Sequence, residues 1–277
     1  TLSSSNIGGI NGLVPSSTLG NPDIKPERTT ELEFGADFSV MGGLATVEAT
    51  LYQQSIEDLI LLVDEAPSSG ASNSWQNGGE METNGLEFAL GLNPTSLLDL
   101  GGLDWNMHMT YYTNESEVTK LTVDPYNYGG FATFLGTYRI EEGWSPTAIV
   151  GADYDADGNH IELGNENPDF RLSFRNSLSF GPLSLSFLID HKEGGHAINL
   201  ANLIYDLGAT TADYEENGSR TAVLGGGSTA PYVESTTYTA LRDLSLTYLL
   251  PADLTEGYGL SNVCLLYTSP SPRDDEL

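Results

Sequence analysis

The segment "DYDADGNHIELGNE" holds the densest group of possible metal ligands in the chain. Asp153, Asp155 and Asp157 occupy positions 1, 3 and 5 of a potential calcium loop, with Gly158 at position 6, where such loops turn sharply. Position 12 is Gly164, although an EF-hand requires a bidentate Glu there, and no helix pattern flanks the segment. An ordinary acidic turn built on Asp-Gly fits the same residues, so calcium binding in this segment is one of two hypotheses.

Aromatic and amide side chains occur together in stretches that we expect to be loops. An aromatic ring offers an apolar face on which a sugar can stack, and amides pair with hydroxyl groups. The candidate substrate contacts are Trp75, Asn77, Tyr126, Asn127, Tyr128 and Trp144, with Asn73 beside the first two. The alternative is that these side chains pack the loops together or contact a partner protein.

Other residues carry weaker chemical signals. Arg171 and Arg175 lie on the polar face of one expected strand and could guide an anionic ligand, but a polar lining is also ordinary there. The four histidines match no two-His metal motif, so we interpret them as structural or solvated. A glycosidase needs two carboxylates that face each other across a cleft, and 39 acidic residues supply candidates without identifying any. We therefore expect no enzyme and no cofactor other than calcium.

Charge and composition restrict the classes of protein. The chain has 277 residues, of which 39 are acidic and 10 basic, and its formal net charge is -29. This charge repels phosphate backbones, so nucleic acid is not an expected partner. The longest apolar run, "LILLV" at 59–63, is far shorter than the ~20 residues that a membrane-spanning helix needs. A helical membrane protein is therefore excluded.

Hydrophobic residues alternate with polar ones along much of the chain. In "LEFALGL" the residues Leu86, Phe88, Leu90 and Leu92 share one face, and "RLSFRNSLSF" has an apolar face broken only by Asn176. The pattern predicts seven strands and a truncated eighth that starts in "YGLSNV". The apolar faces of the seven lie in 32–38, 47–51, 86–92, 105–111, 172–180, 183–189 and 244–248.

The links between these strands alternate between short and long. "MGG" at 41–43, 94–104 and "GP" at 181–182 are short or fairly short, whereas 63–84, 118–169 and 194–237 are long. Tight turns at one end and long loops at the other are typical of an antiparallel outer-membrane β-barrel. Phe34 would then face lipid, and Glu33 would line a wet lumen. A soluble β-sandwich would bury the same apolar faces against a second sheet, and a porin that needs no energy source has the same strands.

Five segments together resemble the C-terminal half of the barrel of TonB-dependent outer-membrane receptors, of the SusC/RagA type found in Bacteroidetes. They are "NPDIKPERTTELEFGADF", "ATLYQQSIEDLI", "SSGASNSWQNGGEMETNGLEFAL", "GNENPDFRLSFRNSLSFGPLSLSFLIDHKEGG" and "YVESTTYTALRDLSLTYLLP". The resemblance implies a barrel of about 22 strands closed by a plug. It also implies active import of a glycan or peptide, energised by TonB, with a SusD-like surface lipoprotein as partner. A soluble or surface carbohydrate-binding module or adhesin is the alternative.

The ends of the chain carry two further expectations. Residues 1–263 are expected to be the C-terminal part of such a barrel in the outer membrane of a Gram-negative cell, without the plug and the first strands. Residues 264–277, "CLLYTSPSPRDDEL", resemble a translated read-through and are expected to be non-native. Cys264 therefore supports no disulfide, metal site or nucleophile.

Overall fold

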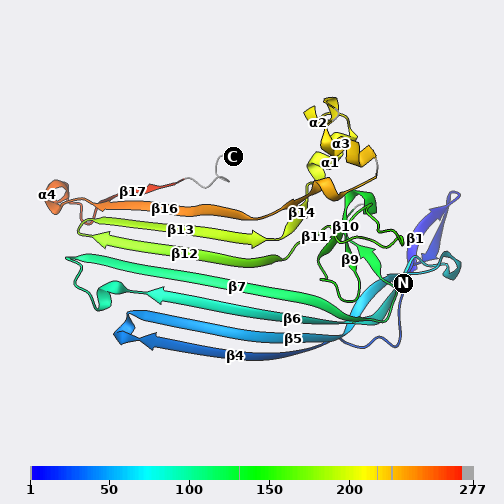
Figure 1. Ribbon diagram of the computed structural model, residues 1–277, viewed down its shortest axis with the longest axis horizontal. Helices are drawn as coiled ribbons and strands as arrows, with labels where there is room; N and C mark the ends of the chain where they lie inside the picture. Colours follow the sequence, from blue (N-terminus) through cyan, green and yellow to red (C-terminus); the bar gives the residue numbers. More distant parts are fainter. Residues whose placement is uncertain (1, 131, 217, 226, 270–277) are drawn as a thin grey trace.

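One open antiparallel sheet dominates the computed structural model, which describes residues 2–130, 132–216, 218–225 and 227–269 (Figure 1). Each main strand pairs with the next one along the chain, and a short strand, β3 (Thr18–Leu19), joins β6 in parallel. In the described residues the sheet is not closed, and β4 and β17 are its edges. The main strands are β4 (Arg28–Val40), β5 (Ala45–Asp64), β6 (Asn73–Leu92), β7 (Leu103–Leu121), β12 (Pro168–Phe180), β13 (Leu183–Gly194), β16 (Tyr238–Leu249) and β17 (Cys264–Thr268). The predicted all-β fold is confirmed.

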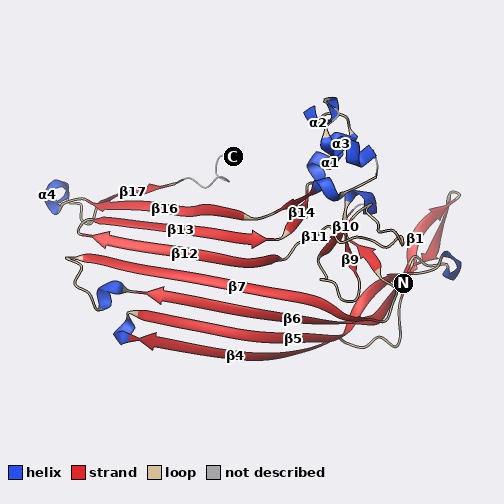
Figure 2. Cartoon of the chain, viewed as in Figure 1, coloured by secondary structure: helices blue, strands red, loops and turns tan. Residues whose placement is uncertain are grey.

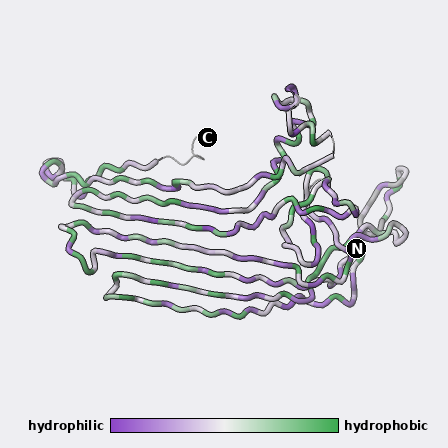
Figure 3. Tube along the Cα trace, in the orientation of Figure 1, coloured by the Kyte–Doolittle hydropathy of each residue, from purple (hydrophilic) through white to green (hydrophobic). Residues whose placement is uncertain are grey.

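The register gathers the alternating apolar residues into one continuous band. Phe34 lies opposite Leu51, and Leu51 lies opposite Leu86 on the next strand. The exposed fractions of Leu32, Phe34 and Phe38 are 58%, 69% and 60%, and no second sheet covers this face in the described part of the chain. The alternation is visible along every long strand (Figure 3). A sandwich would bury these side chains, so the sheet has the form of a barrel wall.

A hydrogen bond accounts for the polar residue in the apolar band. Asn176 is buried, and its Oδ1 accepts a hydrogen bond of 3.0 Å from the indole Nε1 of Trp105 on β7. Pairing lowers the cost of placing an amide oxygen among apolar groups. Asn176 and Trp105 therefore partly satisfy each other within the band.

The two ends of the sheet differ, as the alternating link lengths predict. One end carries turns such as η1 (Met41–Gly43), the Gly181–Pro182 link and η3 (Pro94–Ser96), together with α4 (Ala252–Thr255) and η6 (Glu256–Tyr258) (Figure 2). The other end carries the links 65–72, 122–167 and 195–237, the last with the helices α1 (Leu200–Leu207), α2 (Ala212–Glu215) and α3 (Ser219–Gly225). A hairpin of β1 (Leu2–Ile7) and β2 (Ile10–Pro15) lies at this end as well. Among the described helices, none combines the length and apolar character needed to cross a bilayer.

The prediction of a long loop over 63–84 is wrong. β5 continues to Asp64 and β6 begins at Asn73, so both strands have 20 residues and only 65–72 connect them. A bilayer needs only about 9–11 residues of a tilted strand, so the hairpin extends well beyond that layer. The register shifts between Ile56 and Leu59, and Asp58 there has a φ of 56°, so the sequence pattern changes face at this point.

The last strand also starts later than predicted. Residues Glu256–Tyr258 form a 3-10 turn, Gly259 follows with a φ of 70°, and β17 begins at Cys264. Leu265 and Tyr267 then lie opposite Tyr248 and Leu246 of β16. The unpaired backbone N–H and C=O groups at the edge of a sheet can pair with any segment that adopts an extended conformation. The non-native origin of 264–277 stays a prediction, and residues 270–277 lie outside the described residues.

Candidate functional site

The described residues of the two longest links, 122–167 and 195–237, fold together into one compact unit, which we call the cap. The first link forms a four-stranded sheet, and the second contributes a strand pair and the three helices (Figure 1). The first sheet comprises β8 (Tyr126–Tyr128), β9 (Thr137–Ile140), β10 (Ala148–Val150) and β11 (Gly164–Asn165), and the pair comprises β14 (His196–Ile198) and β15 (Val233–Ser235).

The cap contains most of the fully buried apolar residues. Ala148, Ile149 and Val150 of β10 are at most 1% exposed, and Leu203 and Tyr232 from the second link are 0% exposed. In the described residues only Ala71 and Val118 are buried hydrophobics outside the cap. The cap is thus packed like a small domain, whereas the sheet has one apolar and one polar face.

Thr229 joins the two links at a seam. Its Oγ1 accepts a hydrogen bond of 2.9 Å from the backbone N–H of Ala152 and donates one of 3.0 Å to the carbonyl of Phe134. The carboxylate of Asp153 accepts from the backbone N–H groups of Thr229 and Ala230, at 2.8 and 3.2 Å. Thr229 is 0% exposed, and a Cβ added to Gly151 would lie 2.2 Å from its Cβ. Only glycine at position 151 leaves room for this contact.

Gly151→Val is expected to open the seam. Overpacking a close-packed site costs about 1–3 kcal/mol, and here the displaced group also carries hydrogen bonds. Hydrogen exchange of the amides in 148–153 and 228–232 should become faster in the variant. Gly12→Val on β2, where an added Cβ has nothing within 4 Å, is the control. Unchanged protection in Gly151→Val would contradict the seam.

A buried carboxylate holds the helices of the cap together. Asp206 is 1% exposed, and Arg220 of α3 donates to it from Nε at 2.9 Å and from Nη2 at 3.3 Å. The hydroxyl of Tyr232 donates at 3.0 Å, and the hydroxyl of Thr211 also donates to it. The hydrogen bond from Arg220 lowers the pKa of Asp206 to about 2. Burial, followed by the bond to Asp206, raises the pKa of Tyr232 to about 12.

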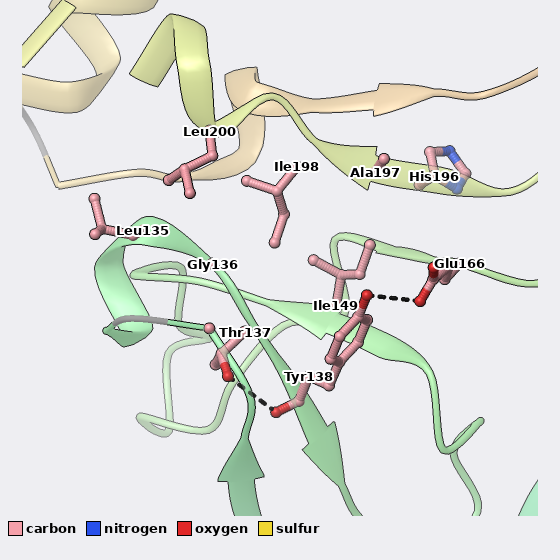
Figure 4. A pocket seen from close by; sticks show the side chains of 11 residues that line it. Leu135, Gly136, Thr137, Tyr138, Ile149, Glu166, His196, Ala197, Ile198 and Leu200 are labelled. Carbon is pink, nitrogen blue, oxygen red and sulfur yellow. Dashed lines mark hydrogen bonds between the residues drawn. The ribbon is translucent and has the colours of Figure 1, made fainter. Parts of the chain in front are cut away.

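A pocket of ≈ 300 Å³ lies along the seam (Figure 4). Leu135 and Leu200 lie toward one end of it, and Glu166 and His196 toward the other. The hydroxyl of Tyr138 donates a hydrogen bond of 2.6 Å to Glu166, and this bond raises the pKa of Tyr138 to about 12. The further lining residues are Gly130, Gly136, Thr137, Ile149, Ala197 and Ile198. The pocket could bind a small group that is apolar at one end and polar at the other.

Two of the predicted contact residues lie on β6 and not in a loop. Asn77 donates from Nδ2 to the carbonyls of Lys25 and Asp58, and its Oδ1 accepts from the backbone N–H of Lys25. It therefore anchors the segment before β4, and its amide is occupied. Trp75 is 42% exposed and lines a shallow groove of ≈ 450 Å³ beside Asn21. Asn73 donates to the carboxylate of Asp64.

The other predicted contact residues lie in the cap. Tyr126, Asn127 and Tyr128 form β8, and Trp144 is in the turn between β9 and β10. Tyr128 donates to the carbonyl of Pro146, and its ring lies 5.4 Å from that of Tyr138. Asn127 accepts from Arg139 at 2.9 Å. The six predicted residues thus divide between the β6 groove and the cap, where several of them bond to other parts of the protein.

The three aspartates of the potential calcium loop do not converge. Asp153 accepts hydrogen bonds from 228–230, whereas Asp155 accepts from the backbone N–H groups of Asp157 and Asn159, both at 2.9 Å. Hydrogen bonds from Asn159 lower the pKa of Asp155. No group of three or more possible metal ligands occurs in the described residues. The geometry is that of an Asp-Gly turn, and calcium binding stays a prediction.

Comparison with known proteins gives one family match over nearly the whole chain. The model of the TonB dependent receptor-like β-barrel matches residues 1–263. A TonB-dependent receptor P26 of Formosa agariphila is 27% identical over 305 aligned positions, which cover 91% of this chain and 31% of that protein. The TonB-dependent receptor SusC of Bacteroides thetaiotaomicron is 31% identical over 104 positions, 37% of this chain and 10% of that protein.

Solved structures show the same fold. The RagAB peptide transporter aligns with a TM-score of 0.71 and 20% identity, covering 97% of this chain and 34% of the matched chain. The present chain spans about a third of the length of the curated relatives that it matches over most of its own length.

Proposed function

Because the chain belongs to the β-barrel family of TonB-dependent receptors and is located in the outer membrane, we propose that it serves active import of a nutrient oligosaccharide or peptide. Energy would come through TonB, and the contact with TonB is expected outside the residues of this chain. A SusD-like surface lipoprotein is the proposed partner at the cap end.

The separation of an apolar outer face from a polar inner face carries this proposal. The apolar band, with Phe34 69% exposed, suits contact with lipid. The opposite face bears Glu33, Tyr52 and Glu87, which line a hollow of ≈ 480 Å³ with other polar residues. A polar solute can pass along such a face without losing all its hydrogen bonds. The cap lies at one end of this route and offers the seam pocket and the groove beside Trp75 as places of first contact.

The alternatives have less support. A soluble carbohydrate-binding module or adhesin would leave the apolar band in water, at a cost that grows with its area. An enzyme would need converging catalytic groups, and the relatives are named as receptors. A porin shares the strands but needs no energy source, so the experiment must test energy dependence.

Uptake by cells that carry the complete gene tests the proposal. Growth on one oligosaccharide or peptide mixture should be lost when the gene is deleted and restored when the gene is returned. In a strain without TonB, returning the gene should not restore growth. Ala197→Trp places a large ring in the lining of the seam pocket. It should raise the dissociation constant of the nutrient by about tenfold, which equals 1.4 kcal/mol. Ala212→Trp, on α2 outside the pocket, is the matched control. Uptake that continues without TonB would show a porin.

A further inference from the structure

Unpaired cations are concentrated on one hairpin of this acidic protein. The ion pairs that lysines and arginines form among the described residues use Arg28, Lys120, Arg139, Arg220 and Arg242, and a further pair joins His191 to Glu193. In the same part of the chain, Lys25, Arg171, Arg175 and Lys192 form no such pair with a carboxylate. Three of these four lie on β12 and β13. With 39 acidic residues available, this grouping is not explained by a shortage of partners.

The register places the three cations in line. Arg171 lies directly opposite Lys192, and Arg175 follows on the same polar face of β12, opposite His108. Four residues of strand separate Arg171 from Arg175 by about 13 Å. These cations therefore begin near the cap and continue down the inner face of the sheet. We call Arg171, Arg175 and Lys192 the cationic strip.

Two of these cations oppose each other, and in the part of the chain that the structure describes one of them has a buried donor without a partner. Like charges directly opposite each other in adjacent strands are destabilising. The Nε of Arg171 is buried and has no hydrogen-bond partner among the described residues. A buried donor without a partner costs about 1–3 kcal/mol. Lys192 donates from Nζ to the hydroxyl of Thr236 at 2.6 Å, which is a neutral partner.

Carboxylates also lie on this inner face. Asp190 on β13 lies opposite Ser173, between Arg171 and Arg175, and its Oδ2 already accepts hydrogen bonds from Arg242 and Tyr238, at 3.1 and 2.8 Å. A second carboxylate lies two strands away. Glu87 on β6 lies opposite Tyr112 on β7, and Tyr112 lies opposite Arg171. Two strand spacings correspond to about 10 Å. Because the protein as a whole carries a net charge of -29, an anion is repelled at long range. An anion that enters the interior despite this repulsion would be attracted only at short range, by the strip.

We infer that the cationic strip binds the carboxylate or sulfate groups of the transported solute. The inference rests on the proposed import function and narrows its substrate to an anionic one. The planar guanidinium groups of Arg171 and Arg175 can each grip a carboxylate or sulfate with two hydrogen bonds, and Lys192 adds a point charge. Acidic oligosaccharides and acidic peptides both present such groups.

Binding to the purified receptor tests this inference with four probes. Hexagalacturonate and hexaglutamate are anionic, and the methyl ester of the first and hexaglutamine are their neutral counterparts. Arg171→Gln/Arg175→Gln/Lys192→Gln should weaken binding of an anionic probe by at least about tenfold, which is 1.4 kcal/mol, and leave the neutral probes unchanged. The anionic probe that binds identifies the source as sugar or peptide. Added salt should weaken it further.

A matched variant separates local binding from net charge. Lys25→Gln/Arg28→Gln/Lys120→Gln removes the same number of positive charges outside the strip and should leave anionic binding nearly unchanged. Equal weakening in both triple variants would overturn the inference, as would equal binding of anionic and neutral probes. A lower free energy of unfolding in the strip variant would also overturn the inference, because it would mean that the three cations stabilise the protein by pairing with its own groups. TonB-dependent uptake of a neutral nutrient would still support the import function in each of these cases.

Discussion

Phe88→Arg is expected to prevent stable assembly of the sheet in the outer membrane, whereas Ala89→Arg should leave assembly unchanged. Phe88 lies between Ala49 and Tyr111 in the apolar band. A tilted strand crosses the bilayer in about 9–11 residues, so Phe88, which precedes the end of β6 at Leu92, lies near the midplane, where an arginine costs about 2–4 kcal/mol. Ala89 faces the polar side, opposite Glu48 and Thr110, where an added cation meets a carboxylate.

Urea titration of the complete receptor in lipid vesicles measures both variants, and the fraction that resists unfolding in detergent gives a second readout. The two substitutions add the same side chain to adjacent positions, so a difference between them reports the face alone. Equal loss of stability would mean that the alternation does not separate lipid from the interior.

Asp206→Ala is expected to disrupt the cap while the sheet remains folded. The substitution removes the carboxylate that pairs with Arg220 and accepts from Tyr232, and breaking a buried pair costs about 3–5 kcal/mol. Limited proteolysis should then cut within 200–232 before any cut in the strands. Glu57→Gln is the control, because its pair with Arg28 is exposed on both sides.

Acid should have the same effect on the unsubstituted protein. The pKa of Asp206 is lowered from 3.8 to about 2, so this group stabilises the cap fully above about pH 4. The stabilisation declines below that value and is lost as the pH falls through about 2. Protease sensitivity of 200–232 that is constant between pH 5 and pH 2 would contradict this role of Asp206.

The sequence predicts the sheet well because its strands obey one local rule. A period of two over seven residues, as in 86–92, requires that one face of the strand contact an apolar environment and the other a polar one. The wall of a barrel, between lipid and a wet interior, meets this requirement. The alternation rule fails at the cap end of β6, where "SNSWQNGGE" (72–80) contains turn residues and few apolar ones. That part is held as a strand by its register with β5 and by Asn77, which lies 52 residues from its partner Lys25.

The cap could not be predicted because it too is held together by contacts between residues far apart in the sequence. Tyr138 and Glu166 are 28 residues apart, and Asp206 and Tyr232 are 26 apart. The helical period of "LANLIYDL" could have indicated α1, but it does not indicate the partners of Asp206. Their contacts depend on how two links meet in space, and no local pattern records this. Aromatic and amide residues in 126–144 mark the region as unusual, but composition cannot distinguish packing residues from contact residues. Tyr128 is bonded to Pro146, and Asn127 to Arg139.

The seam at Thr229 has a consequence for how such a protein can diversify. Because Gly151 in one link makes room for Thr229 in the other, a new sequence in either link must fit the one that is already present. An exchange of 122–167 alone between relatives should therefore yield a poorly formed cap, and an exchange together with 195–237 should yield a sound one. New specificities would be inherited as a pair of links, and the natural unit of recombination is the stretch that encodes both.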